Sequence, residues 1–218
     1  MHLRAALALG HPEPAALELR SAELQTRLGD YPAAVASLER AAATAGADLL
    51  GTIEHRLGQV HHRSGSWALA EAHFNAALVA PTSTDAGTRA RIIADLSLTV
   101  LSAGNPARAA ELALGALAAA EAAQDVRALA QANNLLGLLA SRAGDADRAL
   151  GHLGTSLARA QRADDRAAQV AALNNLALVH RDGGALDAAV ETTRDALRLC
   201  AKEADRHREA AIWKLVQW

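Results

Sequence analysis

Two stretches of the sequence decide the fold: NLLGLLASRAGDADRAL at residues 134–150 and NNLALVHRDGGALDAAV at residues 174–190. They align without a gap at an offset of 40 residues. In each stretch, apolar residues recur three and four positions apart, which is the spacing of one face of an α-helix. A glycine interrupts the pattern in both, so each stretch predicts two helices joined by a short turn.

The same pattern extends over most of the chain as a column of five glycines. These turn glycines are Gly29, Gly65, Gly104, Gly144 and Gly184. Seven residues before each of them stands a small residue, namely Ala22, Gly58, Ser97, Gly137 or Ala177. Glycine allows the left-handed backbone that the turn needs, and small residues let two helices approach closely. We therefore predict an all-α chain of about five helical hairpins, each stacked on its neighbours.

The composition agrees with this fold and excludes several classes of protein. The 218 residues include 57 Ala and 34 Leu, which favour helices, and only 2% aromatic residues, which are too few for a sheet protein. A net charge of −2 argues against nucleic acid as a partner. No run of about 18 apolar residues is present, so no membrane span is expected. A single cysteine, Cys200, is compatible with a reducing compartment, and we expect a cytoplasmic protein.

Repeat two resembles the tetratricopeptide repeat (TPR). It has the pair Leu57–Gly58 in the first helix, Gly65 at the turn, and Ala70 and Phe74 in the second helix. The stretch LNNLALV at residues 173–179 is similar to the long repeats of the kinesin-light-chain type. It also resembles the TPR arms of large bacterial ATPase or cyclase signalling regulators. The resemblance implies a right-handed α-solenoid of about five TPR hairpins, in a bacterial interaction module.

The resemblance covers about residues 15–209 and sets the predicted repeat boundaries. The five repeats are expected at 15–50, 51–89, 90–129, 130–169 and 170–209. The strongest loop signal is the stretch Pro81–Thr88, PTSTDAGT, which we judge too short to be a domain linker.

Both ends of the chain are interpreted as partial repeats. Residues 1–14 are expected to be the last part of a helix that belongs to a preceding repeat. Residues 210–218 are expected to start a sixth repeat or to form a capping helix folded on repeat five. If the chain is a fragment, the apolar face around Ile212, Trp213 and Val216 lacks its covering helix. We then expect self-association through the uncapped ends, or fraying of residues 210–218.

Motifs for chemistry are missing from the sequence. It has no glycine-rich phosphate loop, no paired-cysteine zinc spacing and no nucleophile elbow, so we predict no enzyme activity and no cofactor. His55 and His62 share a helix face but lie seven residues apart, about 10 Å along the axis, which is too far for one zinc ion. We therefore predict no metal site. Asp145 and Asp165 fall in loops or first helical turns, where capping is the expected role.

In the resembled family, the first helices of the hairpins line a concave groove, which implies that a peptide or protein segment binds there. The residues that we assign to this groove are His55, Gln59, His62, Arg63, Leu98, Asn134, Leu138, Arg142, Asn174 and Arg181. Asn134 and Asn174 occupy one column in adjacent repeats, and an amide, which both donates and accepts, can match a peptide backbone. In the resembled repeats such asparagines hold extended peptides. The alternative is that they bond to neighbouring helices.

The rest of the predicted groove is basic at its rim and apolar in its middle. Arg27, Arg63 and Arg142 are either a rim for a carboxylate-bearing ligand or solvated arginines near helix C-termini. Leu98, Leu101 and Leu138 suit one or two hydrophobic side chains of the partner. The function predicted from the sequence is a non-enzymatic scaffold that binds a protein or peptide. The alternative is the regulatory or sensor arm of a multidomain bacterial signalling or transcriptional regulator.

Overall fold

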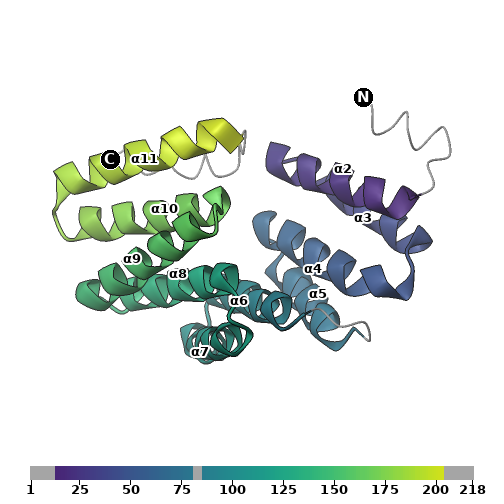
Figure 1. Ribbon diagram of the computed structural model, residues 1–218, viewed down its shortest axis with the longest axis horizontal. Coiled ribbons are helices and arrows are strands. Elements are labelled where there is room, and N and C mark those ends of the chain that lie inside the picture. Colours follow the sequence, from purple (N-terminus) through teal and green to yellow (C-terminus); the bar gives the residue numbers. More distant parts are fainter. Residues whose placement is uncertain (1–12, 81–84, 204–218) are drawn as a thin grey trace. The chain divides into compact units, whose positions relative to one another are not determined.

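The computed structural model describes residues 13–80 and 85–203, which form ten α-helices and no strand within these ranges. The helices are α2 (Pro14–Leu28), α3 (Tyr31–Thr44), α4 (Ala47–Arg63), α5 (Trp67–Val79), α6 (Ala86–Ser102), α7 (Pro106–Ala123), α8 (Val126–Arg142), α9 (Ala146–Arg162), α10 (Arg166–Asp182) and α11 (Leu186–Glu203). Consecutive helices pack in pairs, α2 with α3 through α10 with α11, and short turns join each pair (Figure 1). The predicted all-α class and its five hairpins are confirmed.

The chain divides into two compact units, residues 1–84 and residues 85–218. Unit 1 contributes the hairpins α2–α3 and α4–α5, and unit 2 contributes α6–α7, α8–α9 and α10–α11. The division falls within Pro81–Thr88, the stretch with the strongest loop signal. The stretch that the sequence predicts as a loop therefore contains the boundary between the two units.

The five turn glycines have the backbone conformation that the sequence predicts. Their φ angles lie between 77° and 92°, a left-handed region in which a side chain would be strained. At Gly29, for example, the amide closes the turn on the carbonyl oxygen of Thr26. Each glycine therefore ends a first helix and reverses the chain into the second.

The column of small residues also has the predicted role. A Cβ atom at Gly137 would lie 2.5 Å from Cγ of Leu153, and one at Gly58 would lie 2.6 Å from the Phe74 ring. The two helices of a hairpin are thus in direct contact at this level. In the third hairpin, Ser97 takes the same place, and its hydroxyl donates to the carbonyl oxygen of Ala109 at 2.6 Å. A buried serine is accepted there because its polar atom is hydrogen-bonded.

Acidic and amide residues cap most of the helices. Asp145 accepts a hydrogen bond from the Arg148 amide, and Asp165 accepts one from the Ala168 amide. Both therefore have the predicted capping role. Asp30, Asp85, Asn105 and Asp125 cap α3, α6, α7 and α8 in the same way.

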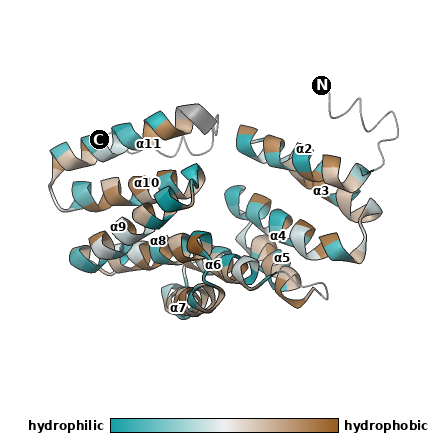
Figure 2. Ribbon diagram, in the orientation of Figure 1, coloured by the Kyte–Doolittle hydropathy of each residue, from teal (hydrophilic) through white to brown (hydrophobic). Residues whose placement is uncertain are grey.

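Helix α5 is apolar on more than one side. Its buried side is formed by Ala70, Phe74 and Ala77, which pack inside unit 1. Leu69 and Val79 nevertheless remain exposed, with 52% and 81% of their surface accessible. Figure 2 shows this helix with little hydrophilic colour along its length.

None of the described helices combines the length and the apolar character that crossing a membrane requires. Several predictions concern residues outside the described ranges. These are most of the helix expected at 1–14, the sixth-repeat or capping segment 210–218, and the apolar face at Ile212, Trp213 and Val216.

Candidate binding surfaces

The first helices of unit 2 present a row of leucines. Helix α8 packs against both α6 and α10, so the three first helices lie side by side. Leu98, Leu138 and Leu178 occupy the same position on these helices, and all three are partly buried. Partial burial leaves part of each of these side chains accessible on adjacent helices. Leu101, which the sequence also places in the groove, is buried instead.

An amide cluster lies one helical turn before this row of leucines. Asn134 on α8 accepts a hydrogen bond from Nδ2 of Asn175 on α10, with 3.0 Å between Asn175 Nδ2 and Asn134 Oδ1. Oδ1 of Asn174 is buried and has no hydrogen-bond partner among the described residues. The predicted pair Asn134 and Asn174 thus lies on adjacent helices, but the direct bond joins Asn134 to Asn175. We call Asn134, Asn174, Asn175 and the three leucines the amide–leucine face.

The α6 side of this face has a different composition. Ala94, which precedes Asn134 by one repeat, is buried. The neighbouring Asp95 accepts a hydrogen bond from Nε2 of Gln131 on α8. This bond ties α6 to α8 at Gln131, three residues before Asn134, where the Asn175 bond ties α8 to α10. The two bonds fix the register of the three first helices.

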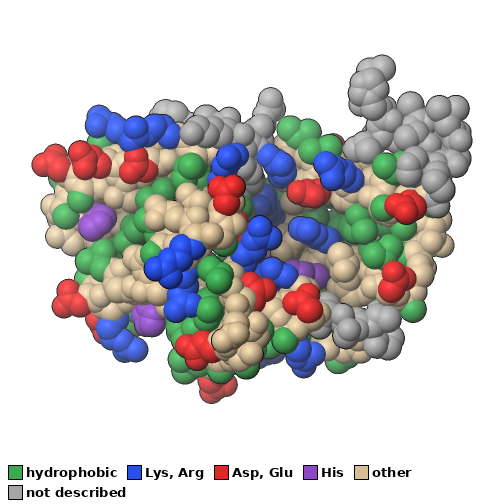
Figure 3. All heavy atoms as spheres, viewed as in Figure 1, with side chains coloured by type: hydrophobic (Ala, Val, Ile, Leu, Met, Phe, Trp, Pro, Cys, Tyr) green, Lys and Arg blue, Asp and Glu red, His purple; other side chains and the backbone are tan. Residues whose placement is uncertain are grey.

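The basic side chains near the face differ in their surroundings. Arg142 at the end of α8 is exposed and has no ion pair with the described residues. Arg181 instead donates to Oδ1 of its neighbour Asp182, with 2.7 Å between Nη2 and Oδ1. The carboxylate offsets much of the positive charge of Arg181, so Arg142 is the stronger candidate for a negatively charged ligand. Figure 3 shows acidic and basic side chains interspersed over the visible surface rather than one field of a single sign.

In unit 1, the predicted residues lie on α4 and form a polar chain. Arg56 Nη1 donates to Oε1 of Gln59, and Nε2 of Gln59 contacts Nε2 of His55 at 3.3 Å. The His55 ring also packs against Phe74, with 5.8 Å between the ring centroids. His62 and Arg63 lie partly buried toward the end of the same helix. This surface thus offers imidazole and guanidinium groups in place of leucines and asparagines.

A second histidine pair of unit 1 lies between α4 and α5. The rings of His61 and His73 are stacked, with 5.2 Å between their centroids, and Nδ1 of His73 contacts Oε2 of Glu54 at 2.7 Å. Burial lowers the pKa of His61, and the charge of His73 lowers it further, while Glu39 acts in the opposite direction. In the described ranges, no three His, Cys, Asp or Glu side chains are grouped so that they could hold a metal ion.

Sequence reasoning missed three members of the polar network. It did not assign Asn175 to the groove, because Asn175 falls in a different column from Asn134. It did not single out Asp95 and Gln131. Asn175 lies one column from Asn134, whereas Gln131 lies four columns, about one helical turn, from Asp95, so a search for polar pairs within a single column misses both bonds.

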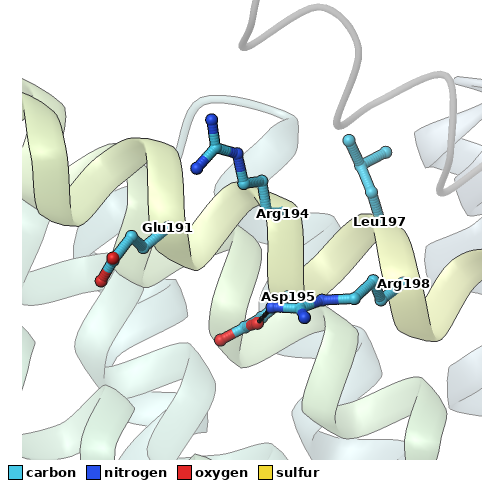
Figure 4. A pocket seen from close by; sticks show the side chains of 5 residues that line it. All are labelled: Glu191, Arg194, Asp195, Leu197 and Arg198. Carbon is cyan, nitrogen blue, oxygen red and sulfur yellow. Dashed lines mark hydrogen bonds and ion pairs between the residues drawn. The ribbon is translucent and has the colours of Figure 1, made fainter.

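A hollow lies along the exposed side of α11 in unit 2. Its lining residues are Glu191, Arg194, Asp195, Leu197 and Arg198, all from this one helix (Figure 4). Asp195 and Arg198 pair with each other, so the charges in the hollow are partly balanced. The hollow lacks a second wall of described residues, and we assign no ligand to it.

Comparison with known proteins identifies the architecture. Residues 128–202 match the family model described as tetratricopeptide repeat. The chain has the TPR fold. The matched residues cover the second and third hairpins of unit 2, where the TPR repeat is most regular. No curated protein matches the sequence.

Solved TPR structures resemble the whole chain at low sequence identity. The Rap conjugation gene regulator of plasmid pLS20, in complex with the Phr* peptide, is 13% identical at a TM-score of 0.78, over 92% of this chain and 57% of that one. A Rap protein complexed with competence and sporulation factor is 14% identical at a TM-score of 0.72, over 94% and 64%. BtubC (BKLC) from P. vanneervenii is 23% identical at a TM-score of 0.62, over 92% and 87%. The chain spans less than two thirds of the length of these two Rap structures.

Proposed function

We propose that this TPR protein is a non-enzymatic scaffold that binds an extended peptide segment of a partner protein on the amide–leucine face of unit 2. The observation that carries the proposal is that Asn134 and Asn174 stand at equivalent positions on adjacent helices, one helical turn before the partly buried leucines Leu138 and Leu178. A ligand with a regular backbone can contact equivalent side chains in successive repeats. The Phr* peptide in the complex of the structurally similar Rap conjugation gene regulator of pLS20 supports a peptide as the ligand class.

The leucines, the amides and Arg142 of this face make different contributions to binding. Leucines remove apolar side chains of the ligand from water, which stabilises the complex without fixing its register. The amides contact the ligand backbone and fix its position, because hydrogen bonds are directional. Arg142 adds attraction for a carboxylate at the edge of the face. No described side chains form a constellation that suggests bond-breaking chemistry.

The test is the double substitution Asn134→Ala/Asn174→Ala. A peptide is first selected on the parent protein from a displayed random library, and its dissociation constant is measured for both proteins. Each hydrogen bond contributes about 0.5–1.5 kcal/mol, so we expect roughly ten- to a hundredfold weaker binding. Gln161→Ala, which changes an exposed amide on the second helix α9, is the matched control and should bind like the parent.

Melting temperatures of the same variants separate binding from folding. Asn134→Ala leaves Nδ2 of Asn175 without its partner, so a small loss of stability is expected. If the double variant melts far lower while its folded fraction binds like the parent, the asparagines are structural and the proposal is wrong.

A second candidate function is the regulatory or sensor arm of a larger signalling protein. It is favoured by the partial coverage of similar regulators. The chain spans 57% of the pLS20 Rap regulator and 32% of a STAND ATPase with a TPR sensor from Pyrococcus horikoshii. Reading the gene on both sides of the present sequence tests this candidate, because a continuous frame that encodes a catalytic or DNA-binding domain would support it.

A further inference from the structure

The bond between Asn175 and Asn134 sets the direction of the Asn134 amide. Nδ2 of Asn175 donates to Oδ1 of Asn134 at 3.0 Å across the contact between α8 and α10. The oxygen and nitrogen of a carboxamide point to opposite sides, so the NH2 group of Asn134 is directed away from α10's Asn175. Asn134 therefore keeps both N–H donors for a ligand, while its oxygen already accepts one hydrogen bond and faces Asn175.

Asn174 is oriented in the same sense. Its Oδ1 is buried, whereas the side chain as a whole is only partly buried. The NH2 group is therefore the polar end that a ligand can reach. The two amides together supply N–H donors, rather than the mixture of donors and acceptors that the sequence suggested. The complementary ligand atoms are carbonyl oxygens.

The spacing of the helices selects a backbone conformation. Packed helices lie about 8–10 Å apart, so equivalent amides on α8 and α10 repeat at about this distance. A polyproline II helix has three residues per turn and rises about 3.1 Å per residue, so carbonyl groups on one side repeat every 9 Å or so. A β-strand repeats on one side every two residues, or about 7 Å, which fits less well.

The row of leucines follows the same repeat. Leu98, Leu138 and Leu178 lie on successive first helices, so an apolar ligand side chain at every third residue would meet one leucine each. A polyproline II helix places every third side chain on one face. Its carbonyl groups also have no partners inside the ligand, which leaves them available to donors on the protein.

We propose that the amide–leucine face binds a segment in the polyproline II conformation through its carbonyl oxygens, with Asn175 as the positioning residue that turns the Asn134 NH2 group toward the ligand. This inference rests on the proposed function and specifies its ligand. Such a segment needs few backbone N–H groups, so proline is tolerated at most positions.

The probe is the capped nonapeptide acetyl-(Pro-Pro-Leu)3-amide, with its all-D enantiomer as the control for non-specific apolar binding. We expect the L-peptide to bind the full chain at least tenfold more tightly than the enantiomer. Asn175→Asp is isosteric but offers only acceptors, so it reverses the Asn134 amide and should weaken binding about tenfold. Asn175→His keeps an N–H at the δ position and should stay within about threefold of the parent.

The NMR resonances of the Asn134 side-chain amide test whether this group contacts the ligand, because a purely structural asparagine would not respond to the peptide. On adding the L-peptide, they should shift in the parent and in Asn175→His but not in Asn175→Asp. Equal binding by Asn175→Asp and the parent would overturn the inference. So would failure of the L-peptide to bind a parent that binds a library-selected peptide through Asn134 and Asn174, and in that case the proposed function stands. If no selected peptide needs Asn134 or Asn174 for binding, both the proposed function and this inference are wrong.

Discussion

Unit 1 and unit 2 have the same hairpin but carry different surfaces on it. In both units, a left-handed glycine ends the first helix, and a small residue lets the second helix approach. The partly buried residues at the surface of the first helices differ: α4 has His55 and Gln59, whereas α8 has Asn134 and Leu138. The residues that fold the hairpin therefore do not restrict those that face a ligand, which is why fold alone does not name the partner.

The largest expected effect is on stability, and it tests the close approach of the two hairpin helices, which both units share. Gly58→Val and Gly137→Val each place side-chain atoms where Phe74 or Leu153 already lies. Both should lose about 3 kcal/mol of unfolding free energy, measured by urea titration. Gly154→Ala is the control, because a Cβ at Gly154 meets nothing within 4 Å, and it should gain about 0.5–1 kcal/mol. Unchanged stability in either valine variant would show that this unit does not use the close approach.

The next largest effect is on peptide binding, and it tests the first-helix surfaces, in which the two units differ. Leu138→Ser removes apolar surface from the row of leucines of unit 2 and should weaken binding of a library-selected peptide about tenfold or more. His55→Ala, on the corresponding helix of unit 1, should change the dissociation constant by less than about twofold. Larger losses from His55→Ala than from Leu138→Ser would place the binding surface in unit 1 instead.

A smaller effect is expected at the edge of unit 2. Arg142 is exposed, so Arg142→Ala should weaken binding of a carboxylate-bearing peptide by about two- to fivefold at low salt. The difference should vanish near 1 M salt, where charges are screened within about 3 Å. Arg162→Ala on α9 supplies the control, since it removes an exposed arginine away from the amide–leucine face. A salt-independent loss would mean that Arg142 acts by packing rather than by charge.

The smallest effect is a pH dependence confined to unit 1. The lowered pKa of His61 means that the unfolded chain takes up a proton more readily than the folded one. Stability is therefore full above the unfolded pKa of about 6.5 and falls as the pH drops through the folded pKa. Hydrogen exchange in peptides from 47–79 should accelerate on acidification more than in peptides from 126–162. His61→Gln should remove this difference in exchange between the two regions. If exchange in both regions of the parent accelerates equally on acidification, protonation of His61 does not control the stability of unit 1.

Local features of the structure were predictable from the sequence, and contacts between repeats were less so. The turn at Gly144 and the cap at Asp145 depend on a few consecutive residues, so the repeat pattern predicts both. The bond from Asn175 to Asn134 depends on how one hairpin is rotated against the next, and the columns do not contain that angle.

The way in which the helices contact one another has a consequence for how this chain folds and changes. The principal helix contacts inside each unit join elements at most two places apart in sequence, such as α8 with α6 and α10. Loops that close early cost little entropy, so each unit is expected to fold rapidly, starting at more than one hairpin. Because its contacts are this local, a hairpin can also be duplicated or deleted in the gene without changing the contacts of distant hairpins. The length of the array is thus open to evolutionary adjustment one repeat at a time.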